Sequence, residues 1–207
     1  MGMLDDFELL KRNGFTLLPY AATKTKMEAH LIAKSIGYPV ALKVISDSIS
    51  HKTDVGGVKI GIKNDQSLSL AYDEIMENAK NSEIRGILVQ KMARKGIELI
   101  IGGKKDAQFG HMVILGMGGV YVEVFREISA RLCPISPKDV EEMVEELASH
   151  PIIKGARGQK GINMEKLKEL MLHTCRFIGK EDIKELDLNP VIFDDKGYDI
   201  VDARMGR

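Results

Sequence analysis

The chain of 207 residues has no tryptophan, only two cysteines and six prolines, and an aromatic content of 5%. Two cysteines cannot frame a disulfide-rich fold, and Cys133 and Cys175 lack the close spacing of a metal-binding pair. We therefore expect both to be reduced, packed residues of a cytoplasmic protein. No apolar run approaches the roughly 20 residues that a membrane helix needs. Residues 1–6 also lack the basic and apolar segments of a signal peptide.

An excess of charge of one sign is missing as well. The chain has 30 basic and 30 acidic residues, which gives a formal net charge of zero. A nucleic-acid or anionic-membrane surface needs clustered positive charge, so we expect neither kind of partner. A chain of this length can bury a core as one large domain or as two small lobes.

Helix-like and strand-like patterns occur in mixed order along the chain. Apolar periodicity predicts helices at about 3–13, 24–35, 65–79, 136–149 and 163–178, with Thr23 and Asp65 as caps of the second and third. Apolar runs predict strands at about 40–45, 58–62, 86–92, 97–102, 112–115, 121–125 and 130–132, and two more around a turn at 194–197. Because helices and strands do not alternate regularly, an α+β fold is favoured over a doubly wound sheet.

The segment 49–58 concentrates more chemistry than any other part of the chain. It joins two predicted strands and contains a histidine, a lysine, two hydroxyls, a carboxylate and two adjacent glycines. Adjacent glycines let backbone N–H groups converge on an anion, and Lys43 and Lys52 would add positive charge. His51 can be neutral and nucleophilic near pH 7. The pattern indicates a phosphate-binding loop beside a nucleophile, and the alternative is a glycine hairpin with a solvated histidine.

The C-terminal strands carry a second polar group. Asp187 and Asn189 are two residues apart on a predicted strand, so their side chains leave from one face. A four-residue loop at 194–197 would place Asn189 opposite Asp202 and Asp187 opposite Arg204, with facing Cβ atoms about 5 Å apart. Carboxylate and amide oxygens in this arrangement suit Mg²⁺. The alternative is an ordinary polar sheet face with an Asp–Arg pair.

Blocks along nearly the whole chain resemble the ATP-grasp β subunit of ADP-forming acyl-CoA (acetyl-CoA) synthetases. In chain order they are Gly37-Tyr38-Pro39-Val40-Ala41-Leu42-Lys43, Ser50-His51-Lys52-Thr53-Asp54-Val55-Gly56-Gly57-Val58, Gly96-Ile97-Glu98-Leu99, Phe109-Gly110, Gly116-Met117-Gly118-Gly119, Arg131-Leu132-Cys133-Pro134, Gly155-Ala156-Arg157-Gly158 and Leu188-Asn189-Pro190. The resemblance implies one ATP-grasp domain over residues 1–207. Its lobes would be at about 14–91 and 92–207, enclosing a nucleotide site.

The resemblance also implies an enzyme divided between two chains. An α subunit would bind CoA and carry its own phosphorylated histidine, in a hetero-oligomer such as α₂β₂. Acyl-CoA and phosphate would give an acyl phosphate, which phosphorylates the α histidine. The phosphoryl group would then pass to ADP in the ATP-grasp lobes and form ATP.

By resemblance, His51 is the phosphoryl relay of this chain. The nucleotide ADP or ATP would contact Lys43, Lys52, Gly56, Gly57, Val58, Gln90, Lys91, Met92 and Glu98. Mg²⁺ would be held by Asn189 and Asp202, with Asp187 supporting them. The chemistry of the residues agrees, because a neutral imidazole can attack phosphorus while cations and Mg²⁺ neutralise the phosphoryl oxygens.

The chain departs from the family pattern in two places. His111 stands where proline is expected after Phe109-Gly110, and Asn163 where an acidic residue is expected after Arg157-Gly158. The resemblance therefore assigns no role to His111 or to the Arg157 loop. Two other hypotheses remain: a different ATP-grasp carboxylate ligase, for which His51 would be dispensable, and a non-catalytic module that senses nucleotides.

Overall fold

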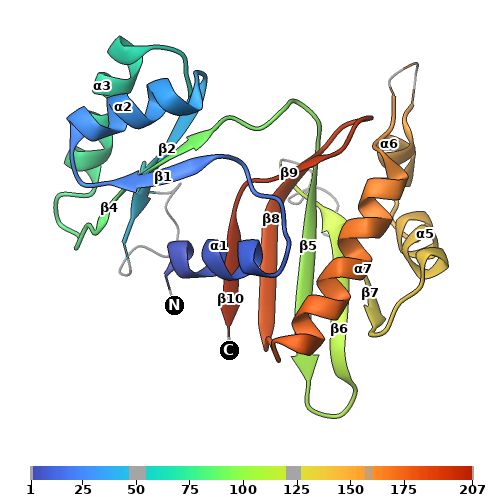
Figure 1. The fold of residues 1–207 in the computed structure, drawn as a ribbon. Coiled ribbons are helices and arrows are strands. Elements are labelled where there is room, and N and C mark those ends of the chain that lie inside the picture. The colour runs from blue at the N-terminus through green and yellow to red at the C-terminus, as the bar shows by residue number, and fades with distance from the viewer. Residues whose placement is uncertain (1, 47–54, 120–126, 157, 159, 207) are drawn as a thin grey trace. The chain divides into compact units, whose positions relative to one another are not determined.

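The chain forms two compact units (Figure 1). The large unit comprises residues 3–17 and 93–207, and the small unit comprises residues 18–92. The lobe boundaries inferred from the sequence stay a prediction, and residues 14–17 cluster with the large unit. The computed structural model describes residues 2–46, 55–119, 127–156, 158 and 160–206.

The small unit is built on a four-stranded antiparallel sheet. Its strand order is β1 (Tyr20–Thr23), β4 (Gly86–Lys91), β2 (Val40–Ile45) and β3 (Val58–Ile62). Helices α2 (Lys26–Ile36) and α3 (Asp65–Asn78) share one buried core with Val40, Leu42 and Val44 of β2. Because neighbouring residues of a strand point to opposite faces, Ala41 and Lys43 lie on the face away from these helices.

Both helices of the small unit begin at caps that differ from the predicted ones. Thr25 caps α2 by accepting a hydrogen bond from the Glu28 backbone N–H, and Asn64 caps α3 in a capping box with Ser67. The predicted cap Thr23 is the last residue of β1, which pairs with β4 up to this position. The predicted cap Asp65 instead accepts a hydrogen bond from the Tyr38 hydroxyl at 2.7 Å.

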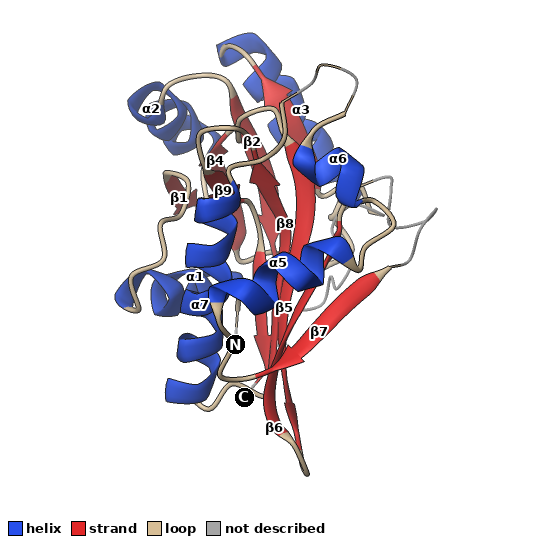
Figure 2. Ribbon diagram, turned by 90° about the vertical axis from the view of Figure 1, so that its right-hand side faces the viewer, coloured by secondary structure: helices blue, strands red, loops and turns tan. Residues whose placement is uncertain are grey.

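The large unit contains a six-stranded antiparallel sheet, with most strands in one row and β9 (Tyr198–Ile200) paired to β8. The row is β10 (Ala203–Gly206), β8 (Glu185–Phe193), β5 (Ile97–Asp106), β6 (Gly110–Met117) and β7 (Ile128–Leu132). Helices α1 (Met3–Arg12), α5 (Pro137–Glu145) and α7 (Met164–Lys180) lie on one side of this sheet (Figure 2). The short helix α6 (His150–Lys154) follows α5.

The strands of the large sheet alternate between a helix-covered face and a second face. Leu99, Ile101 and Gly103 of β5 point to the helices, and a Cβ atom at Gly103 would lie 3.0 Å from Ile178 of α7. The alternate residues of β5, beginning with Glu98 and ending with Asp106, therefore define the other face. We call it the open face of the large sheet.

The predicted pairing of the C-terminal strands is confirmed. Arg204 pairs with Asp187, and Tyr198 pairs with Phe193 across the turn at 194–197. Between these pairs, the Asn189 backbone N–H donates to the Asp202 carbonyl at 3.2 Å. The register that brings Asn189 and Asp202 together is therefore the one in the fold.

The prediction of two reduced thiols is wrong, because Cys133 and Cys175 form a disulfide with Cα atoms 5.9 Å apart. Cys133 follows β7, and Cys175 lies in the part of α7 that packs on the sheet. The two positions are 42 residues apart in sequence, so only the packing of α7 brings them together.

We expect reduction of this disulfide to destabilise the large unit. Closing a loop of 42 residues removes chain entropy from the unfolded state worth roughly 4 kcal/mol. Urea unfolding with and without dithiothreitol measures the difference. The Cys133→Ser variant, which has no disulfide, should have the same free energy of unfolding in both conditions. An equal free energy of unfolding under both conditions for the unsubstituted chain would contradict this prediction.

Candidate functional site

Two buried polar side chains lie on the helix-free face of the small sheet. Lys43 of β2 is 5% exposed and Gln90 of β4 is 1% exposed. Gln90 pairs with Ala41 and Lys43 with Leu88, so the two polar groups share one face. A positive charge and an amide on one buried sheet face are groups that can bind an anionic ligand such as a phosphate.

The described end of the glycine loop lies beside Lys43. Val58 begins β3 as the strand partner of Lys43, and the Gly57 carbonyl accepts a hydrogen bond from the Val44 N–H at 2.8 Å. Gly56 has φ +66°, and its carbonyl accepts from the Asn78 amide at 3.4 Å. The fold therefore joins three predicted nucleotide residues to Lys43. His51 and Lys52 lie outside the described residues.

The sequence predicts that residues 90–92 contact the nucleotide, and the structure shows which groups Lys91 and Met92 bind. The Lys91 ammonium donates to the Gly37 and Tyr38 carbonyls at 2.7 and 3.1 Å, at the C-terminal end of α2. The Lys91 and Met92 backbone N–H groups donate to Pro19 and Pro39. The charge of Lys91 thus stabilises the small unit, and a nucleotide contact at these residues stays a prediction.

A cavity of about 520 Å³ lies within the large unit, and Glu98 is part of its wall. Its volume is in the range of small-molecule sites. The wall also includes Lys95, Gly96, Ile97, Gly118, Gly119, Ile152, Lys160, Gly161, Ile162, Phe193, Asp194 and Asp195.

Two glycines allow the Glu98 carboxylate its position at this cavity. The Gly118 N–H donates to the Glu98 carbonyl at 2.7 Å. A Cβ atom at Gly119 would lie 2.7 Å from Glu98 Oε2, which is closer than real Cβ atoms approach an oxygen. Gly119 also has φ +63°, a backbone conformation that favours glycine.

Sequence reasoning missed several of the charged residues around this cavity. Lys160 forms an ion pair with Asp195 at 2.6 Å, and Arg94 contacts Asp199 at 3.0 Å and Asp194 at 3.2 Å. From the sequence, the two aspartates Asp194 and Asp195 are residues of the turn at 194–197 and nothing more. No local pattern could have shown these contacts, because each joins segments that are far apart in the chain.

The polar group of the C-terminal strands lies on the open face, where Asp187 pairs with Gly102. Burial raises the pKa of the Asp187 carboxyl, which the positive charge of Arg204 opposes and the carboxylate of Asp202 reinforces. A hydrogen bond from the Asn189 side chain also lowers this pKa. A bound cation would reduce the electrostatic repulsion between the Asp187 and Asp202 carboxylates.

A metal ion here would need ligands beyond carboxylates. Among the described residues, no group of three or more His, Cys, Asp and Glu side chains could hold one. The amide oxygen of Asn189 and the phosphate oxygens of a bound nucleotide would have to complete the coordination of Mg²⁺.

A model of the ATP-grasp domain matches residues 3–206. The acetate–CoA ligase (ADP-forming) I subunit beta of Pyrococcus furiosus is 38% identical over 203 residues, which is 96% of this chain and 88% of that subunit. The chain belongs to the ATP-grasp family of ADP-forming acetate–CoA ligases. The resemblance and the α+β fold expected from the sequence are thereby confirmed.

Other relatives of this ATP-grasp chain are longer. The acetate–CoA ligase (ADP-forming) I of Archaeoglobus fulgidus is 42% identical over 202 residues, which is 95% of this chain but only 29% of that protein.

A solved structure of the dinucleotide-forming acetyl-coenzyme A synthetase 1 of Candidatus Korarchaeum cryptofilum contains coenzyme A, Ca-AMPCP and HgCl⁺. It is 40% identical with a TM-score of 0.92, over 99% of this chain and 92% of that one. In the described part of the ATP-grasp chain, every helix is too short or too polar to cross a membrane.

We expect Gly119→Ala to displace the Glu98 carboxylate and to weaken Mg-ADP binding by roughly tenfold or more, equivalent to about 1.4 kcal/mol. Gly110→Ala is the matched control, because Gly110 has φ +80° and no atom within 4 Å of its Cβ position. Both substitutions cost similar backbone strain, so only the first tests Glu98. Calorimetric titration with Mg-ADP measures the difference. Equal affinities in the two variants would show that Glu98 does not contact the nucleotide.

Proposed function

We propose that this chain is the nucleotide-binding ATP-grasp part of an ADP-forming acetyl-CoA or acyl-CoA synthetase. With an α subunit it would convert acyl-CoA, ADP and phosphate into a carboxylic acid, CoA and ATP. The observation that carries the proposal is the match over 99% of the chain, with TM-score 0.92, to a synthetase solved with coenzyme A and a nucleotide analogue. We place the reaction in the cytoplasm.

Lys43 and the loop at Gly56 and Gly57 would bind the phosphates of the nucleotide. Glu98 and Gln90 would contact other parts of the same molecule. The buried position of Lys43 supports its role, since an ammonium group that is shielded from water attracts a phosphate more strongly than an exposed one.

His51 would relay the phosphoryl group. The P–N bond of a phosphohistidine on the α subunit breaks as a new P–N bond to His51 forms. An oxygen of the ADP β-phosphate then attacks that phosphorus and releases neutral His51. One structure of the Korarchaeum relative has a phosphorylated phosphohistidine segment, and another has this segment pointing towards the nucleotide-binding site.

Asn189 and Asp202 would hold Mg²⁺, with Asp187 supporting them. The residues fit such an ion, because burial and the nearby carboxylate of Asp202 raise the pKa of Asp187. When bound, the ion neutralises charge on the nucleotide phosphates. Arg204, the strand partner of Asp187, helps to keep that carboxylate ionised.

Reconstitution tests the proposed activity. The purified chain should form ATP from acetyl-CoA, ADP and phosphate only after the α subunit is added, in a complex such as α₂β₂. Full activity from the chain alone would contradict the proposal. Nucleotide binding without any phosphoryl transfer in the mixture would indicate a nucleotide-sensing module instead.

We expect His51→Asn to abolish phosphorylation of this chain. Incubation with the α subunit, Mg²⁺ and γ-labelled ATP should give an acid-labile, base-stable label on the unsubstituted chain. His30→Asn, a substitution of another histidine of the small unit, should leave the label in place. Transfer between ATP and the α subunit that continues unchanged in His51→Asn would remove the relay and favour an ATP-grasp ligase that does not use this histidine.

A further inference from the structure

The polar group made by Asp187, Asn189 and Asp202 occupies one part of the open face of the large sheet. Another part of the same face carries a continuous apolar patch. The patch consists of Ile100, Met112, Ile114, Ile128, Ala130 and Leu132, from three adjacent strands. Strand pairing places Ile114 beside Ala130 and Met112 beside Leu132. Ile128 is 65% exposed and Leu132 is 48% exposed, so the patch is accessible at its β7 side.

The polarity of β7 is the reverse of that of an ordinary surface strand. Ser129 and Arg131 point to the helix-covered face, where both contact Glu146, the residue after α5. Ile128, Ala130 and Leu132 point outward. A half-exposed antiparallel strand normally turns its apolar residues inward and its polar residues to water. This inversion indicates that another surface covers the outward side of β7.

The backbone of β7 supports the same conclusion. β7 is the last strand of the sheet, and in the described part of the chain no strand pairs with its outer edge. Exposed edges are usually protected by charge, proline or a bulge, and an edge with apolar residues on its outward face is a site for association with another chain.

The patch and the polar group belong to one row of paired residues across the sheet. From β10 to β7 this row is Arg204, Asp187, Gly102, Ile114 and Ala130. Adjacent strands are about 4.8 Å apart, so Ile114 lies two strands, or about 10 Å, from Asp187. A partner chain bound to the patch would therefore lie close to the proposed Mg²⁺ ion and to the phosphates of the nucleotide bound beside it.

We propose that the apolar patch and the outer edge of β7 form the docking surface for the α subunit, an inference that rests on the proposed function. When ATP is formed, the phosphoryl group comes from the α subunit, so its histidine segment must come close to the nucleotide phosphates and the Mg²⁺ proposed on this same face. A partner anchored at the patch holds its histidine segment near that group and excludes water from it. A second copy of this chain would cover the face without bringing a donor.

The double variant Ile128→Lys/Leu132→Lys tests this surface. We expect its Kd for the cognate α subunit, measured by calorimetry, to rise at least about tenfold, because two ammonium groups would lose water at an apolar contact. Met27→Lys/Leu31→Lys is the matched control, since Met27 is 75% exposed and Leu31 is 62% exposed on α2. The control should bind the α subunit normally, and both variants should bind Mg-ADP normally.

The outcomes separate this inference from the proposed function. If the unsubstituted pair makes ATP and the β7 variant binds the α subunit with unchanged Kd, the docking surface is wrong and the function stands. If light scattering finds a dimer of the chain alone that the β7 variant abolishes, with unchanged Kd for the α subunit, a second copy occupies the patch. If the unsubstituted chain binds no α subunit, both proposals fail. Ile128→Thr/Leu132→Thr, which places uncharged, β-branched side chains at both positions, replaces the lysine variant if that one does not fold.

Discussion

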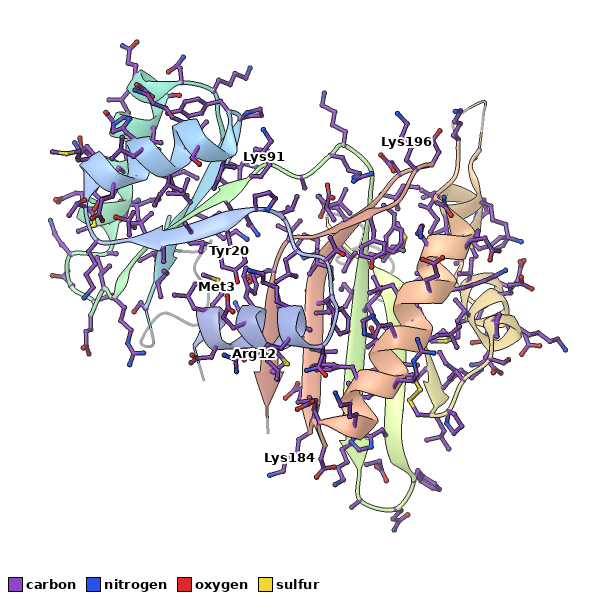
Figure 3. All side chains as sticks on the ribbon, viewed as in Figure 1. Met3, Arg12, Tyr20, Lys91, Lys184 and Lys196 are labelled. Atoms are coloured by element: carbon purple, nitrogen blue, oxygen red, sulfur yellow. A yellow bond between two sulfur atoms is a disulfide. The ribbon has the colours of Figure 1, made fainter. Side chains whose placement is uncertain are left out.

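The pairing of β8 with β5 on one side and with β10 on the other determines what the large unit can do. It places Asp187 between Arg204 and Gly102 and holds Asn189 opposite Asp202. Because side chains alternate along a strand, a slip of β8 by one residue would exchange these polar groups for the buried Leu188. Every step proposed on the open face, from Mg²⁺ binding to the approach of a phosphoryl donor, depends on this register. Figure 3 shows the side chains of both units on the ribbon.

Those features of the fold that depend on neighbouring residues could be predicted from the sequence. The register of β8 with β10 was correct because a short turn fixes how two successive strands pair. The helix caps of the small unit were misplaced by one or two residues and are Thr25 and Asn64. For the first helix the reason is that the pairing of β1 with β4 takes Thr23 into the sheet. At the start of α2, strand pairing thus moved a boundary that local capping preferences alone would have placed earlier.

The features that the sequence could not supply depend on distant segments. The cavity beside Glu98 brings Lys160 and Asp195 together, and neither has a local signal. The disulfide likewise depends on how α7 packs against the sheet, so two cysteines without a recognisable spacing gave the wrong expectation. For the candidate site, the sequence correctly placed Asp187 opposite Arg204 and Asn189 opposite Asp202, while the roles of the site residues stay predictions. The wall of the cavity could be seen only in the packed chain.

The inverted polarity of β7 is possible only because the end of α5 supplies an acid on the inner face. The guanidinium of Arg131 lowers the pKa of the Glu146 carboxyl to about 2, and the Ser129 hydroxyl also donates to it. Glu146 is therefore ionised over the whole physiological range and stabilises the polar residues that β7 turns inward. Without this partner, the strand would be more stable with its apolar residues turned toward the helices. Glu146, which touches neither the polar group nor the patch, thus fixes which side of β7 remains available to another chain.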